Sequence, residues 1–156
     1  VGRLDSRFKG IDRDAAGENF EFDPAHTNLD GAYAACINDY LRRELRYESD
    51  TPYNMISKLY MSWDFGSKDQ HLNVAESLRR AMSSNPHMKV YVGAGYFDLA
   101  TPHFASDYVL NHMALDKSLA ANITRHYYDA GHMMYVHIPS LKAQSKHLRD
   151  FVRKSA

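Results

Sequence analysis

The chain has 156 residues, which is typical of one domain, and 44% of them are apolar, which is enough for a sizeable core. Nineteen acidic and nineteen basic residues balance, so no basic face indicates nucleic acid as a partner. No apolar run approaches the ~20 residues of a membrane span, and the single cysteine, Cys36, excludes an intrachain disulfide.

The first thirty residues are polar, rich in Gly and Asp, and without a sustained period. They predict an irregular arm with at most short strands. The chain starts Val-Gly-Arg-Leu, which has neither an initiating Met nor the pattern of a signal peptide. We therefore expect a fragment or a processed piece, for which a missing targeting segment says nothing about location.

A helix is predicted from Gly31 to about Tyr47, because apolar residues recur there at helical spacing. Asn28 or Asp30 is available as its N-cap. Cys36 lies in this pattern, and a buried, inert thiol is the favoured interpretation. The segment that follows is ambiguous between a strand and a short helix.

The rest of the chain alternates helix and strand. The pattern predicts, in order, a helix from Leu72 to Asn85, a strand over 88–92 leading into Gly95, a helix with Thr101 as N-cap and Pro102 as its first residue, a strand over 122–128, and a helix from Pro139 onward. This order is typical of a parallel α/β sheet. Because two parallel strands do not form a stable sheet alone, we expect the end of a larger α/β sheet, preceded by a mainly helical insertion.

The last two of these helices carry apolar residues at helical spacing, and we expect those residues to face the core. They are Phe104, Tyr108, Met113 and Leu115 in the first helix, and Leu141, Leu148, Phe151 and Val152 in the second. In the second helix the lysines and arginines of the other stripe are expected to face water.

Two polar residues follow the predicted strands. Asp98 stands after the first strand in GAGYFDLATP, and His132 stands after the second in DAGHMMYVH. Because functional side chains gather at the carboxyl ends of parallel strands, and neighbouring strands lie ~4.8 Å apart, we expect the two side chains within hydrogen-bond reach. A carboxylate that accepts from one ring nitrogen fixes the imidazole tautomer, and the other nitrogen then serves as a general base.

Simpler interpretations of both residues stay open. An Asp after a strand is commonly a turn former or a helix cap, and a lone His is commonly a surface or structural residue. The Gly93/Gly95 pair is not a phosphate loop, because GAGYFD lacks the third glycine of the dinucleotide-binding fingerprint. No cofactor is therefore predicted.

A metal site is the competing use of nine histidines. The residues that could cluster are His103 with His112, or His126 with His132 and His137. Neither group has the His pair with an intervening Glu that a zinc helix needs, and a cysteine pair is absent from the sequence. Metal binding is therefore the less favoured interpretation.

The segment GYFD closes on Asp98, with a Thr-Pro pair beyond it, and the segment AGHM contains His132 and Met133. Together with the closing helix PSLKAQSKHLRDFV, they resemble the carboxyl end of the serine carboxypeptidase family, a group of α/β-hydrolase peptidases. Residues 1–70, with VGRLDSRFKG and DGAYAACINDYLRREL, resemble the insertion that precedes this end in bacterial members. The resemblance thus spans most of the chain.

This resemblance implies a cap-like insertion over residues 1–68 and the carboxyl-terminal part of an α/β-hydrolase core over residues 69–156. Asp98 is implied to orient His132, which activates a serine and later protonates the leaving amine. Met133 is implied to line the pocket for the substrate's terminal residue. Such enzymes remove one residue from the free carboxyl end of a peptide, and they commonly work best in acid. For a bacterial member a periplasmic or secreted location is plausible.

The chain departs from the family pattern in two places. Eukaryotic members usually have a disulfide-linked Cys just before Ala-Gly-His, where Asp129 stands here. The nucleophile is absent, because no serine stands in a Gly-x-Ser-x-Gly elbow, and Ser67 in FGSKD lacks the flanking pattern. The serine is expected on an N-terminal portion of the same enzyme, and this chain alone is expected to be inactive.

Two other functions stay open. One is a different α/β-hydrolase activity, such as an esterase or an acyltransferase, on the same scaffold. The other is a non-catalytic module whose exposed apolar sheet edge binds a partner or a second copy as a homo-oligomer.

Overall fold

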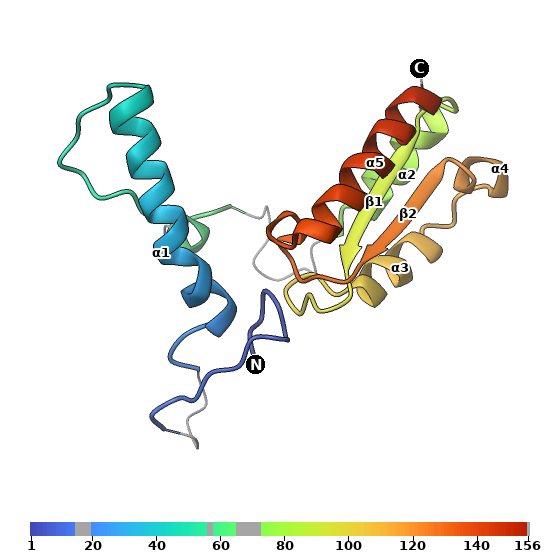
Figure 1. Ribbon diagram of the computed structural model, residues 1–156. Helices are drawn as coiled ribbons and strands as arrows, with labels where there is room; N and C mark the ends of the chain where they lie inside the picture. Colours follow the sequence, from blue (N-terminus) through green and yellow to red (C-terminus); the bar gives the residue numbers. More distant parts are fainter. Residues whose placement is uncertain (15–19, 56–57, 65–72, 156) are drawn as a thin grey trace.

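The computed structural model describes residues 1–14, 20–55, 58–64 and 73–155 and falls into two parts (Figure 1). The N-terminal part contains an irregular arm, α1 (Pro24–Asp39), the π-helical turn η1 (Tyr40–Glu44) and the short helix η2 (Lys58–Met61). The C-terminal part contains α2 (Ala75–Ser84), β1 (Val90–Gly95), α3 (His103–Asn111), α4 (Lys117–Ala120), β2 (Ile123–Tyr128), η3 (Met134–Val136) and α5 (Ile138–Ser155). Ser67, Leu72 and the expected boundary between residues 68 and 69 lie outside the described residues.

The C-terminal part is a mixed α/β structure around two parallel strands. β1 and β2 pair in register from Val90 with Ile123 to Gly95 with Tyr128. Within the described residues the sheet contains only these two strands. The predicted order of helix, strand, helix, strand and helix, with parallel strands, is therefore confirmed.

Alternate side chains of β2 meet helices on opposite faces of the sheet. On one face, the hydroxyl of Tyr127 donates to Asp107 of α3 at 2.6 Å. On the other face, the ring of His126 stacks on His147 of α5 with centroids 3.9 Å apart, and the hydroxyl of Tyr128 lies 3.1 Å from Nδ1 of His147. Because side chains of a strand alternate between faces, α3 and α5 cover opposite sides of the sheet.

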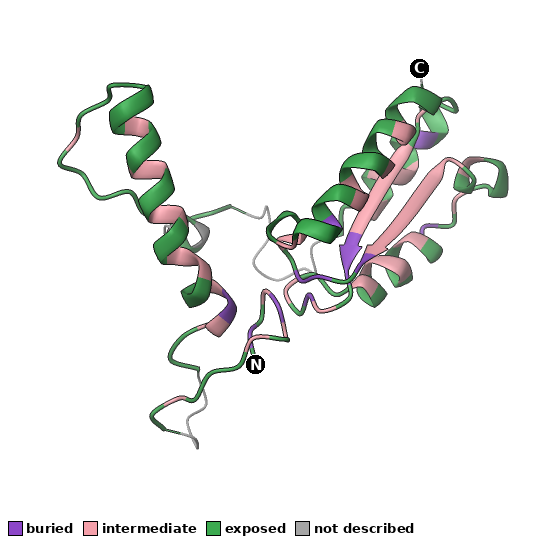
Figure 2. Ribbon diagram, in the orientation of Figure 1, coloured by how far each residue is buried: buried purple, intermediate pink, exposed green. Residues whose placement is uncertain are grey.

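The helices expose several apolar residues that the sequence pattern predicts to be buried (Figure 2). The exposed ones are Phe104 and Tyr108 in α3, and Leu141, Leu148 and Val152 in α5. The prediction is confirmed for Met113, which is buried. α5 packs on the sheet through His147 and Phe151, whose ring meets Tyr91 of β1. The predicted apolar stripe of α5 therefore meets the sheet only in part, since Phe151 contacts β1 while Leu141, Leu148 and Val152 are exposed.

α1 begins earlier than predicted. Asp23 caps it, and Pro24 is its first residue, where the missing N–H of proline costs nothing. Asn28 and Asp30, which the sequence offers as caps, lie inside the helix. Cys36 is exposed on this helix, so the prediction of a buried thiol is wrong. None of the helices in the described residues is both long and apolar enough to cross a bilayer.

Candidate active site

Asp98 and His132 lie on two loops that leave the same edge of the sheet. Because β1 and β2 run parallel, their carboxyl ends are neighbours. The pairing continues beyond the strands, since the N–H of Tyr96 donates to the carbonyl of Tyr128 at 3.0 Å and that of Phe97 to Ala130 at 3.1 Å. These bonds keep the two loops together where the polar side chains emerge.

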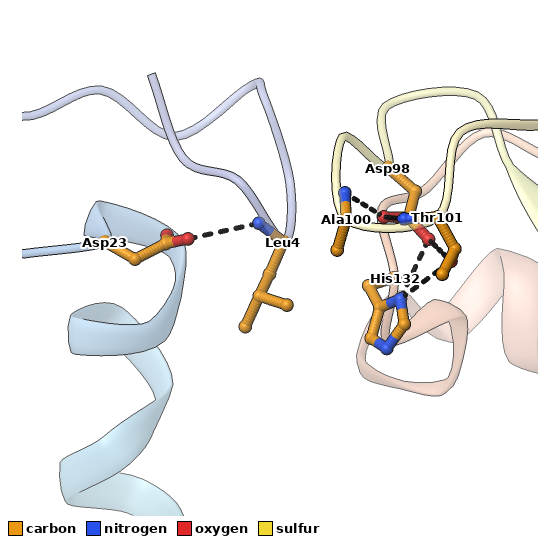
Figure 3. A network of polar contacts seen from close by, with 6 residues as sticks. All are labelled: Leu4, Asp23, Asp98, Ala100, Thr101 and His132. Carbon is orange, nitrogen blue, oxygen red and sulfur yellow. Dashed lines mark hydrogen bonds and ion pairs between the residues drawn. The ribbon is translucent and has the colours of Figure 1, made fainter. Parts of the chain in front are cut away.

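The two side chains form a hydrogen bond (Figure 3). Nδ1 of His132 lies 2.8 Å from Oδ2 of Asp98, so the predicted approach is confirmed. The Asp98 side chain is 5% exposed and that of His132 is 43% exposed. Within the described part of the chain, Nε2 of His132 has no hydrogen-bond partner.

Asp98 accepts further bonds from its own loop. Its Oδ1 accepts from the N–H groups of Ala100 at 2.8 Å and Thr101 at 2.9 Å, and its Oδ2 accepts from the Thr101 hydroxyl at 2.7 Å. Burial alone would raise the pKa of Asp98, but the bonds from Thr101, His132 and Ala100 outweigh it and lower the pKa. Thr101 is therefore not the predicted cap, because α3 begins at His103 with Pro102 in the N-cap position.

The charge of Asp98 decides the proton arrangement on the ring. An ionised carboxylate only accepts hydrogen bonds, so Nδ1 of His132 is the donor in this pair. Neutral imidazole then carries a lone pair on Nε2. The arrangement can therefore take a proton at the exposed nitrogen and stabilise the resulting imidazolium.

The N-terminal arm is a third component of the site. The N–H of His132 donates to the carbonyl of Leu4 at 2.7 Å. On the other loop, the N–H of Leu99 donates to the carbonyl of Arg3 at 3.0 Å, and the N–H of Ser6 donates to the carbonyl of Phe97 at 2.9 Å. The arm thus binds His132 itself and both neighbours of Asp98. Sequence patterns give no sign of this role, because residues 1–30 show no period.

Two glycines allow this close approach. A Cβ on Gly131 would lie 2.3 Å from the carbonyl oxygen of Leu4 and 2.5 Å from Cβ of Asp5. A Cβ on Gly95 would lie 2.3 Å from the carbonyl oxygen of Gly131. Real side chains do not tolerate such distances, so glycine directly before His132 is required by the packing of the arm.

The side chains of Asp5 and Arg7 fix the arm to the same loops. Arg7 binds Asp5 in a two-pronged ion pair, with Nε 3.0 Å from Oδ1 and Nη2 2.7 Å from Oδ2. Its Nη1 donates to the carbonyl of Asp129 at 3.0 Å, and its guanidinium lies 4.8 Å from the ring centroid of Phe97. Burial raises the pKa of Asp5, but the bonds from Arg7 and the N–H of Gly131 outweigh it and lower the pKa.

A cavity of about 240 Å³ lies between the arm, α1 and the segment that follows His132, and we call it the α1 pocket. It is lined by Leu4 of the arm, His26, Leu29, Asp30 and Tyr33 of α1, Met55, and Met133 and Tyr135 after His132. Most of its lining is apolar, with Nε2 of His26 3.8 Å from Oδ1 of Asp30 as a polar exception. Met133, implied by the resemblance to bind substrate, lines this pocket, and it directly follows His132 in the chain.

The other candidate histidines have structural partners instead. His103 packs against Tyr96 and Tyr127, His112 against Tyr108, and His126 against His147, while Nδ1 of His137 bonds to the hydroxyl of Ser140 at 2.8 Å. Among the described residues, no group of three His, Cys, Asp or Glu side chains is placed to hold a metal ion.

No family model, curated protein or solved structure matches this chain. The interpretation of the site therefore depends on its geometry and on the motifs that contain Asp98 and His132.

Proposed function

We propose that this chain is the carboxyl-terminal portion of a serine carboxypeptidase and supplies the acid and the base of its triad. The observation that carries the proposal is the 2.8 Å bond between His132 Nδ1 and buried Asp98, which leaves Nε2 without a partner among the described residues. The pair stands at the adjacent carboxyl ends of two parallel strands, where α/β enzymes place functional groups. The chain order supports this interpretation, because Asp precedes His as in α/β-hydrolases.

In the proposed reaction, Nε2 of His132 takes the proton of a serine hydroxyl while the serine attacks the peptide carbonyl. The imidazolium then gives this proton to the leaving amine. Asp98 stays ionised throughout, because its hydrogen bonds hold its pKa low, and it stabilises the positive ring. The serine and the oxyanion hole come from an N-terminal portion of the same enzyme.

The exposed apolar surface of the C-terminal part supports the proposal that further parts of an enzyme pack against it. An apolar hollow of about 470 Å³ runs between Val92 of β1 and the α3 residues Ala105 and Val109, beside Thr101 of the Asp98 loop. Phe104 and Val109 are exposed on α3. Further strands of the sheet, next to β1, would cover these groups.

The α1 pocket is the proposed site for the side chain of the peptide's terminal residue. Its wall includes Met133, the residue after His132, and Leu4, whose carbonyl accepts from the N–H of His132. The apolar lining favours an apolar side chain. No metal or other cofactor takes part in the proposed reaction.

The test is hydrolysis by the full-length protein that contains this chain. We expect it to release the last residue of an N-blocked peptide with a free carboxyl end, and to react with a fluorophosphonate probe at a serine. Replacing His132 by Gln removes the base and should lower kcat by about 10⁴-fold or more. His112→Gln is the matched control, because within the described residues the His112 ring bonds only to the Tyr108 carbonyl and stacks on the Tyr108 ring.

The substrates distinguish this function from its alternatives. A simple ester hydrolysed faster than any blocked peptide, with no preference for a free carboxyl end, would indicate an esterase on the same scaffold. A full-length protein that hydrolyses neither, and whose serines ignore the probe, would overturn the proposal and favour a binding module.

A further inference from the structure

Asp23 uses both of its carboxylate oxygens, and each serves a different part of the chain. Its Oδ1 caps α1 by accepting from the N–H groups of Ala25 at 2.8 Å and His26 at 3.3 Å. Its Oδ2 accepts from the N–H groups of Arg3 at 2.8 Å and Leu4 at 3.2 Å in the arm. The start of α1 and the arm are therefore joined through one side chain.

Leu4, whose bond to Asp23 is shown in Figure 3, continues this connection to the base. Its N–H donates to Asp23, and its carbonyl accepts from the N–H of His132 at 2.7 Å. Leu4 also lines the α1 pocket, together with His26 from the first turn of α1. Two hydrogen bonds thus link the helix that forms the pocket wall to the backbone of His132.

We propose that Asp23 is a positioning residue for His132. Asp23 holds the arm, and the arm keeps the base and the α1 pocket in a fixed geometry. Its consequence for catalysis rests on the proposed peptidase function, whereas its consequence for the position of His132 does not. Asp23 touches no reacting group, and it acts through Leu4.

The chemistry of the side chain explains why a carboxylate is needed here. A helix cap alone requires one acceptor oxygen, which Ser and Asn supply as well as Asp. Asp23 binds two N–H donors from α1 and two from the arm, and these two pairs require two acceptor oxygens. In Asn, one of the two positions is an NH₂ group, which would face one pair of N–H donors and could not accept from it. The bonds from these N–H groups also lower the pKa of Asp23 against the effect of burial, so both oxygens stay acceptors at neutral pH.

Asp116 provides a matched control. It caps α4 through Oδ1 alone, which accepts from the N–H of Ser118 at 2.8 Å and from the Ser118 hydroxyl at 2.5 Å. Asp116→Asn therefore makes the same chemical change at another helix cap, in which one oxygen suffices. Asp23→Ser is the second variant, because serine keeps the α1 cap and removes the oxygen that holds the arm.

The first measurement is amide hydrogen exchange of these residues within the full-length protein, which needs no activity. With Asp23→Asn or Asp23→Ser, we expect exchange at Leu4 and His132 to accelerate about 10-fold or more, since their bonds open independently of the sheet. Exchange in β2, for example at His126, whose N–H faces β1, should stay unchanged, as should all three amides in Asp116→Asn. If Asp23→Asn does not fold, Asp23→Ser is judged by the same amides.

The second measurement is kinetics in the full-length protein. A displaced base should lower kcat by about 10- to 100-fold in either Asp23 variant and leave Asp116→Asn unaffected. Unchanged exchange at Leu4 and His132 would overturn the proposal whatever the activity, and so would faster exchange with an unchanged kcat. If the unaltered enzyme proves inactive on every substrate, the peptidase function fails, and faster exchange at His132 still supports the positioning role.

Discussion

The C-terminal part and the N-terminal arm reach the same site by different means. In the C-terminal part, parallel strands bring Asp98 and His132 together, and helices cover both faces of the sheet. The arm has no regular secondary structure near the site, yet its backbone bonds His132 and both neighbours of Asp98. Asp98 and His132 thus come from one part of the chain, whereas the backbone bonds that hold their loops come from the arm, which is far away in sequence.

The difference extends to what holds each part in place. Strands β1 and β2 share a ladder of backbone bonds, so the loss of one bond leaves its neighbours intact. The arm depends on a few bonds and on two carboxylates, Asp5 and Asp23, each of which accepts from several donors. We therefore expect changes to charge or space at the arm to release it while the sheet survives.

We expect acidification to have the largest effect on the difference in stability between the arm and the sheet. Folding lowers the pKa of Asp5, Asp23 and Asp98. Groups of this kind stabilise the fold fully above their unfolded pKa of about 3.9, and the stabilisation is lost as the pH falls through their lower folded values. The free energy of unfolding should therefore fall below about pH 4, with a slope of up to about 1.4 kcal/mol per pH unit for each proton taken up.

A pH titration followed by amide NMR separates the two parts. Signals of Leu4 and His132 should move or broaden before those of the sheet, because two of the three carboxylates serve the arm. A single transition in which arm and strands change together would show that the arm is no weaker than the sheet. Asp116→Asn serves as the control for loss of an exposed carboxylate.

Filling the space at Gly131 with a methyl group should have the next largest effect on the free energy of unfolding. In Gly131→Ala the new methyl group would meet the Leu4 carbonyl oxygen at 2.3 Å and the Asp5 backbone at 2.8 Å, and neither can turn away as a flexible side chain can. We expect a loss of about 2–3 kcal/mol in the free energy of unfolding, as for other overpacked sites. Denaturant unfolding measures it.

Gly31 is the matched control for this change. It lies in α1, where a methyl group added to its Cα would have no described atom within 4 Å, so Gly31→Ala should stabilise the chain by up to about 1 kcal/mol. Equal effects of the two substitutions would mean that the arm does not press on the His132 loop in solution.

Sequence patterns predict the regular elements of the C-terminal part and the meeting of its two polar side chains. Periodicity marks α2, β1, β2 and α5, and parallel strands force the ends that carry Asp98 and His132 into contact. The same patterns fail for the arm, since its contacts are single backbone bonds that leave no repeat in the sequence. One local signal is present, because Asp23-Pro24 is a typical helix start, and it would have placed α1 correctly.

The buried faces could not be predicted for a different reason. Helical spacing identifies the apolar stripes of α3 and α5, but Phe104 and Leu148 are exposed because nothing in the described residues covers them. Thr101 illustrates the limit at the site itself. Its position before Pro102 fits a cap, whereas the fold turns its hydroxyl to Asp98, which lies three residues earlier in the chain.

Removing the Thr101 hydroxyl should have the smallest effect, and it tests how far the C-terminal part orients its own pair. Thr101→Val keeps the shape of the side chain but takes away one of the donors to Asp98 Oδ2, at 2.7 Å. The pKa of Asp98 should rise toward its usual value, because this bond helps to lower it. A hydrogen bond to a charged group contributes about 1.5 kcal/mol, so kcat of the full-length enzyme should fall roughly tenfold.

Thr124→Val is the control, at a strand position paired with Tyr91 near the far end of the sheet. It should leave kcat unchanged. If Thr101→Val also keeps full activity, the remaining bonds from Ala100, Thr101 N–H and His132 suffice to hold Asp98. The orientation of the imidazole would then depend more on the arm behind His132 than on the loop that carries its acid.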